Sequence, residues 1–255
     1  MDAKELIESL EDSKLCDDFK NYVRDIYMSY KAGTIESGRC IANRVALFSV
    51  NEGNGLEEMI DIVNKLWCEL EDYSSLGTEY ETLFYPVMDD DMNYKKYVTK
   101  RDIAIHDIEE ILASYYTRVL CIDISEWMEM IEGPEFRAVL YRIRRKLPVQ
   151  YIYLRIPAVD ELSLRKIREA INWFINVDVI YTPPFSLEDY YDHAFKKAKE
   201  NDIILDDESK GLLKRVIDDR RKDRFFKGIK TVDAIVDDMM FNAMRRLHHE
   251  NLQEV

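Results

Sequence analysis

The sequence is poor in the two residues that most often interrupt regular structure. Its 255 residues include only 8 glycines and 6 prolines, whereas hydrophobic residues make up 47%. A chain of this length can bury a substantial core, either as one domain or as a large domain with a small one. We therefore expect mostly regular secondary structure, and the composition excludes collagen-like and disordered classes.

Cysteine motifs, long apolar runs and a secretory leader are also missing. No apolar run approaches the ~18 residues of a membrane span, and the N-terminus has no basic region followed by an apolar stretch. We expect a cytoplasmic protein without membrane contacts. The four cysteines show neither CxxC nor CxxH spacing, which gives no indication of disulfides or zinc; they are Cys16, Cys40, Cys68 and Cys121.

Recognisable hydrolase and metal motifs are absent from the sequence as well. None of the four histidines has an HxxxH or HExxH partner, and no serine lies in a G-x-S-x-G setting. The acidic run Asp89, Asp90 and Asp91 lacks the glycine and the spaced ligands of a calcium loop, so we interpret it as a solvated loop. The sequence therefore predicts no catalytic triad and no resident metal.

Positive charge is scarce relative to negative charge. The 36 Lys and Arg residues face 50 Asp and Glu residues, which gives a formal net charge of -14. Such a balance disfavours non-specific binding to nucleic acid and to anionic membranes over most of the surface. We accordingly expect a protein partner rather than a nucleic acid.

Apolar segments that suit buried strands alternate with helical patterns through the middle of the chain. Alternation of this kind predicts a mostly parallel sheet covered on both faces. A helical lead-in over residues 3–31 comes first. The expected strands are 42–50, 80–88, 118–125, 150–157 and 177–184, and the expected helices between them are 56–71, 100–115, 135–146 and 160–175.

Only helical patterns follow the pair Pro183 and Pro184, which marks a domain boundary. Ser186 and Asp189 have the spacing of a capping box at the start of the first of these helices. We predict three regions: a helical lead-in over 1–40, an α/β core over 41–184 and a helical lid over 185–255.

The segment after the first strand has the framework of a phosphate-binding loop. It runs VALFSV, then NEGNG, then LEEMIDIVNKLWCEL, that is, strand, glycine turn and helix. A G-x-x-x-x-G-K-[ST] loop needs its Lys for phosphate charge and its hydroxyl for Mg²⁺. If Gly55 is the second glycine of the motif, Leu56 occupies the position of the Lys and Glu57 that of the Ser or Thr. The first glycine is replaced by Val50. Glu52 and Glu58 add further negative charge.

This order of elements resembles the AAA+ ATPase module over roughly residues 40–250. The stretch DRFFKGIKTVDAIV at 223–236 looks like the lid segment of the group that includes the stage V sporulation protein K and rubisco activase-type ATPases. On that match Lys230 takes the position of the sensor-2 arginine. The stretch 183–209 looks like the family's proline-containing turn into the first lid helix. The resemblance implies a parallel five-stranded P-loop NTPase-like sheet with a small helical lid.

The residues that the resemblance assigns to chemistry are mostly replaced. Asp123 at the end of RVLCIDIS matches the Mg²⁺-side carboxylate of the Walker B motif, but Ile124 stands where the catalytic Glu belongs. Arg155 lies at the sensor-1 position, where it could contact a phosphate, although a strand-end ion pair is the favoured interpretation. The segment NWFINVD at 172–178 has no arginine finger.

These substitutions predict a degenerate AAA+ module, a pseudo-ATPase without catalytic residues. It would act through protein contacts with an active AAA+ paralogue, a hetero-oligomer or a client. The sequence establishes no cofactor. The candidate ligand is ATP or ADP with magnesium, and Asp123 would hold the magnesium if the Mg-nucleotide binds. Two alternatives stay open: a divergent, active ATPase in protein remodelling, and a clamp-loader-like subunit on DNA. The predicted degenerate nucleotide site comprises Gly53, Asn54, Gly55, Asp123, Arg155 and Lys230.

Overall fold

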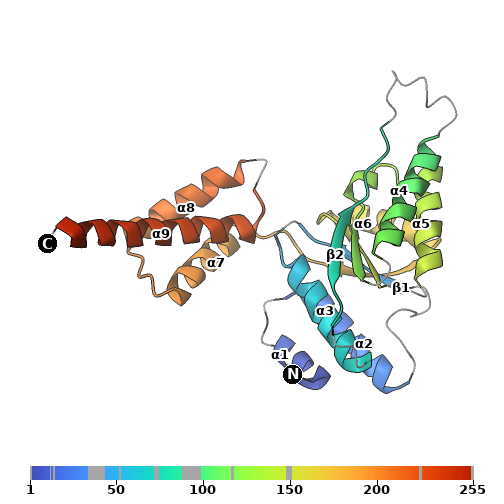
Figure 1. The fold of residues 1–255 in the computed structure, drawn as a ribbon, viewed down its shortest axis with the longest axis horizontal. Helices are drawn as coiled ribbons and strands as arrows, with labels where there is room; N and C mark the ends of the chain where they lie inside the picture. Colours follow the sequence, from blue (N-terminus) through green and yellow to red (C-terminus); the bar gives the residue numbers. More distant parts are fainter. Residues whose placement is uncertain are drawn as a thin grey trace. The chain divides into compact units, whose positions relative to one another are not determined.

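A computed structural model of the chain forms two compact units (Figure 1). The sheet unit comprises Met1–Val50 and Gly55–Thr182, and the helical unit comprises Asn51–Asn54 and Pro183–Val255. The structure describes residues 2–11, 13, 15–33, 44–51, 53–71, 75–87, 99–115, 118–147, 151–223 and 226–253. The predicted acidic loop at 89–91, Cys40 and Glu52 lie outside these residues.

Five parallel strands form the centre of the sheet unit, in the order β2-β3-β4-β1-β5. This arrangement confirms the predicted α/β class with a five-stranded parallel sheet, followed by helices only. The strands are β1 (Arg44–Ser49), β2 (Thr78–Thr82), β3 (Val119–Asp123), β4 (Ile152–Ile156) and β5 (Asn176–Tyr181).

Alternating side chains of the central strands feed two hydrophobic cores, one on each face of the sheet. On β1, Val45 and Leu47 point to one core, while Ala46 and Phe48 point to the other. Helices α4 (Lys100–Ser114), α5 (Pro134–Lys146) and α6 (Glu161–Asn172) cover the first core. Helices α1 (Ala3–Glu11), α2 (Asp17–Lys31) and α3 (Leu56–Glu71) cover the second. The predicted helical lead-in is therefore two helices that belong to the core of the sheet unit.

The prediction for the second strand was wrong in its bounds and in its burial. Residues 80–88 were expected to form a buried strand, whereas β2 spans Thr78–Thr82 and is only partly buried. β2 lies at the edge of the sheet, where polar residues are tolerated because one side of the strand has no neighbouring strand. Pro86 cannot donate a backbone hydrogen bond, which argues against a longer strand there.

Three helices form the helical unit, namely α7 (Leu187–Glu200), α8 (Asp207–Arg221) and α9 (Ile229–Gln253). Their own small core includes Tyr190, Ala194, Leu213, Ile217 and Val236. The capping box predicted for Ser186 is confirmed, because its hydroxyl accepts from the Asp189 amide while the Asp189 carboxylate accepts from the Ser186 amide. Among the described residues, no helix is both long and apolar enough to cross a membrane.

Candidate functional site

The register of the sheet brings two of the predicted site residues together. β3 and β4 pair in parallel with Asp123 beside Arg155, and β1 lies on the other side of β4 with Phe48 beside Arg155. Because parallel strands end at the same edge, the polar residues that follow these strands meet there, where open α/β sheets usually bind ligands. This edge of the sheet unit is the candidate site.

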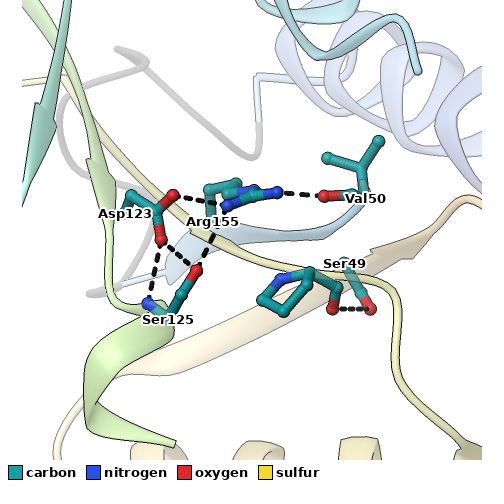
Figure 2. A network of polar contacts seen from close by, with 6 residues as sticks. Ser49, Val50, Asp123, Ser125 and Arg155 are labelled. Atoms are coloured by element: carbon teal, nitrogen blue, oxygen red, sulfur yellow. Dashed lines mark hydrogen bonds and ion pairs between the residues drawn. The ribbon is translucent and has the colours of Figure 1, made fainter. Parts of the chain in front are cut away.

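Arg155 is the centre of a polar network at this edge (Figure 2). Its Nη1 lies 2.5 Å from Oδ2 of Asp123 and donates to the Ser125 hydroxyl at 3.1 Å. Its Nε donates to the backbone carbonyl of Val50 at 3.1 Å. The strand-end ion pair favoured for Arg155 from the sequence is therefore confirmed, and the guanidinium links the ends of β1, β3 and β4.

The second oxygen of the Asp123 carboxylate is also engaged. Oδ1 accepts from the Ser125 amide at 2.8 Å and from the Ser125 hydroxyl. The side chains of Arg155 and Asp123 are only 13% and 26% exposed. Charge-assisted hydrogen bonds are stronger than neutral ones, and removing one partner of a mostly buried pair would leave the other charge without compensation.

This arrangement does not fit a Mg²⁺ ion on Asp123. The ion needs near-octahedral oxygen ligands, and the guanidinium of Arg155 already contacts Oδ2. Glu57, which the sequence comparison assigns to the position of a Mg²⁺-binding hydroxyl, is an exposed residue of α3. Across the described ranges, no group of three or more His, Cys, Asp or Glu side chains is placed to hold a metal.

The residue after Asp123 is directed into the protein interior. Ile124 is 1% exposed and belongs to the core that α4, α5 and α6 cover. A buried aliphatic side chain cannot polarise a water molecule for attack on a phosphate. Ile124, which the sequence resemblance assigns to the position of a catalytic base, is therefore a packing residue in this structure.

The backbone conformation of the turn between β1 and α3 explains why glycines occur there. Gly53 and Gly55 have φ angles of +79° and +89°, which other residues rarely adopt. Within the helical unit, a Cβ on Gly53 would lie 1.9 Å from the carbonyl oxygen of Lys227, whereas a Cβ on Gly55 would find room. Close packing on Lys227 thus requires a glycine at 53.

Asn54 is the predicted site residue that the structure leaves unsatisfied. Its side chain is buried, and neither Nδ2 nor Oδ1 has a hydrogen-bond partner within the described part of the chain. A buried amide without partners costs free energy, and a bound water or ligand commonly offsets that cost. Asn54 is therefore a buried polar group of the turn whose hydrogen-bonding capacity is unused within the described residues.

The remaining predicted residue belongs to the helical unit. Lys230 is exposed in the first turn of α9, whereas Asp123 and Arg155 lie in the sheet unit. Its sensor-2 role stays a prediction.

Two contributors to the site were missed from the sequence. Ser125 and the carbonyl of Val50 complete the Asp123–Arg155 network. The D-x-S spacing of Asp123 and Ser125 was an available indication, because an Asp side chain often accepts from the amide two residues later. The Val50 carbonyl had no such indication, since its role depends on the strand order.

Cys121 lies two residues before Asp123 but has no nucleophilic character. Burial, together with the neighbouring Asp123 carboxylate, raises the pKa of its thiol to about 12. At neutral pH the thiol therefore stays protonated, and only the thiolate is a nucleophile.

No protein-family profile and no curated protein sequence matches the chain. Several solved structures are similar over much of it. The ADP form of the Aeropyrum pernix ORC2 protein has 14% identity and a TM-score of 0.42, with 96% of this chain and 68% of that one covered. The replication initiator DnaA, bound to AMPPCP and single-stranded DNA, has 12% identity and a TM-score of 0.44 over the same shares. The Aeropyrum pernix ORC1 protein in complex with DNA has 13% identity and a TM-score of 0.47, over 89% and 60%. Similarity at this level assigns neither a family nor a function.

Proposed function

We propose that this chain is an AAA+-type module that does not hydrolyse ATP and that acts through contacts with another protein, such as an active AAA+ paralogue or a client. The observation that carries the proposal is that both oxygens of the Asp123 carboxylate already have partners within the protein. Arg155 and Ser125 use both of its oxygens, so the group that would hold Mg²⁺ serves the fold instead. A module that keeps the fold but lacks the residues for hydrolysis can still act through surfaces that contact other proteins.

The other positions that hydrolysis requires support the same proposal. ATP hydrolysis needs a cation on the β- and γ-phosphates, a metal and a positioned water. Leu56 replaces the loop lysine at the start of α3, Glu57 adds a negative charge in the same turn, and Ile124 replaces the base. An arginine finger alone accounts for about 10³ to 10⁵ in rate in GTPases, so the combined losses are expected to leave hydrolysis at background.

Nucleotide titration with and without Mg²⁺ tests this proposal. ATP and ADP are titrated into the purified chain by calorimetry, with melting temperature and phosphate release followed in parallel. We expect no phosphate release above background, and any nucleotide affinity should not change with Mg²⁺. A ligand at 100 times its dissociation constant would add about 2.7 kcal/mol of stability, which a melting curve detects.

Two variants distinguish the proposal from the active-ATPase alternative. In that alternative, Arg155 or Lys230 replaces the missing loop cation and Asp123 still holds Mg²⁺. Mg²⁺-dependent phosphate release by the natural chain that disappears in Asp123→Ala would establish it and overturn our proposal. Arg165→Ala, which removes an exposed ion pair with Glu169 on α6, is the matched control. It should leave nucleotide binding and phosphate release unchanged.

Nucleotide binding by the natural chain and by Asn54→Ala distinguishes two kinds of non-hydrolysing protein, one that binds a nucleotide and one that does not. If ATP or ADP binds without Mg²⁺ and Asn54→Ala weakens that binding, the turn retains a nucleotide site without hydrolysis. If neither nucleotide binds at millimolar concentration, the module works without a cofactor. Both results agree with the proposal, and phosphate release is the measurement that can contradict it.

A DNA-associated role is the remaining alternative. The net charge of -14 disfavours it, and the expectation against nucleic-acid binding stays a prediction. Single-stranded and duplex DNA are therefore included as probes at low and physiological salt. Binding that weakens as salt increases would favour the DNA-associated alternative, because phosphate contacts release counterions.

A further inference from the structure

The exposed apolar residues of α9 are not explained by the core of its own unit. Val232, Val236 and Met239 pack inward in the helical unit. Phe241 lies two residues after Met239, which rotates it by about 200° around the helix axis. It is 64% exposed, and Met244, three residues later, is 57% exposed.

This outward face lies on the part of α9 that its neighbours do not cover. Within the helical unit, α7 and α8 flank the first part of α9, and the C-terminal part of the helix continues beyond both (Figure 1). Phe241 and Met244 are three residues apart and therefore neighbours on the helix surface, and contiguous exposed apolar side chains mark a candidate interaction site.

Opposite charges border the apolar residues on the same face. Asp238, Phe241 and Arg245 follow one another at i, i+3 and i+7, so they share one side of the helix. Asp238 and Arg245 are both exposed. The face therefore has an acidic end, an apolar centre and a basic end.

We propose that this face of α9 binds the same face of α9 in a second copy of the chain, in antiparallel orientation. A twofold axis near Phe241 would bring the two Phe241 rings together. It would also place Asp238 of each copy opposite Arg245 of the other, as an isologous contact requires. The proposal goes beyond the function proposed above, and its test uses no nucleotide.

The charge order also disfavours the parallel arrangement. Parallel helices in register would set Asp238 against Asp238 and Arg245 against Arg245, and like charges in direct opposition are unfavourable. The same pattern is self-complementary when one helix is reversed. One turn of helix on either side of Phe241 is thus enough to specify the orientation.

A contact through one helix face is small, so we expect weak and reversible self-association. Sedimentation velocity of the full chain from micromolar to millimolar concentration should show a monomer–dimer equilibrium. Phe241→Glu should abolish the dimer. Leu212→Glu, at a residue of α8 that is 57% exposed, is the matched control and should dimerise like the natural chain.

Exchange of the border charges tests the orientation. Asp238→Arg alone and Arg245→Asp alone should each weaken the dimer by about tenfold or more, because both contacts become repulsive. An equimolar mixture of these two variants should recover association, since every border charge then faces an opposite one. Circular dichroism checks that each variant retains its helices.

Three results would overturn the proposal. The natural chain could stay monomeric through the whole concentration range, which would exclude self-association through this face. Both single charge variants could dimerise like the natural chain, or the mixture could stay monomeric. Either of those outcomes would exclude the antiparallel pair even if Phe241→Glu abolished the dimer.

Discussion

The carboxyl edge of the sheet unit and the outer face of α9 differ in how their side chains are satisfied. At the sheet edge, Asp123, Ser125 and Arg155 bind one another and the backbone of Val50. On α9, the apolar side chain of Phe241 lies in solvent. The charged side chains at the sheet edge are thus satisfied by one another, whereas an apolar side chain of the helical unit is exposed to solvent. The proposed non-hydrolysing function uses the first observation, and the proposed self-association uses the second.

The largest loss of stability is expected when the Asp123–Arg155 network of the sheet unit is broken. Arg155→Ala should lower the free energy of unfolding by about 3 kcal/mol, because it leaves the partly buried Asp123 carboxylate without its cation. Tryptophan fluorescence in a urea titration reports this unit selectively. The chain has 3 tryptophans, and all of them (Trp67, Trp127 and Trp173) lie in the sheet unit.

A double-mutant cycle separates the ion pair from a general loss of packing. Asp123→Ala combined with Arg155→Ala should cost less than the sum of the two single changes, because no unpaired charge is left. Additive costs would contradict the coupling. Arg165→Ala should not move the midpoint measurably, since its pair with Glu169 is exposed.

A smaller effect is expected in the helical unit, where the two faces of α9 can be compared directly. Val236→Ala should cost about 2 kcal/mol, because it removes buried methyl groups and leaves a cavity. Phe241→Ala should leave the stability of a dilute sample unchanged, since that ring is outside the core. Far-ultraviolet circular dichroism measures both, and equal costs would contradict the assignment of the two faces.

The smallest change in stability is expected from the aspartate helix caps, which occur with the same geometry in both units. Asp160 accepts from Ser163 at the start of α6, and Asp206 accepts from Ser209 at the start of α8. These hydrogen bonds lower the pKa of both carboxyls below the ordinary value of 3.8. A lowered folded pKa means that each cap stabilises fully above 3.8 and loses its contribution as the pH falls through the folded value.

Alanine and asparagine variants test the cap prediction. Asp160→Ala and Asp206→Ala should lower the melting temperature at neutral pH, and the deficit should disappear in strong acid. Asparagine at either position should keep a cap without that pH dependence. A deficit that persists unchanged in acid would mean that the carboxylate charge is not the stabilising element.

Local patterns were enough to find most of the elements. The predicted helix 56–71 matches α3, and 135–146 differs from α5 by one residue at its start. These segments have helical spacing of apolar residues and clear ends, which depend only on neighbouring residues. The second strand was misplaced because an edge strand needs no buried face, so its apolar content is a poor guide.

The sequence by itself determined the α/β alternation, the glycine turn and the leucine that follows it at position 56, because each depends on residue type at short spacing. Only the tertiary structure decided what Asp123 and Arg155 do. Their contact joins residues 32 positions apart on β3 and β4, and the Val50 carbonyl belongs to the residue that follows β1, on the other side of β4. Strand order and register set these neighbours, and both follow from the packing of the whole sheet unit rather than from any local pattern.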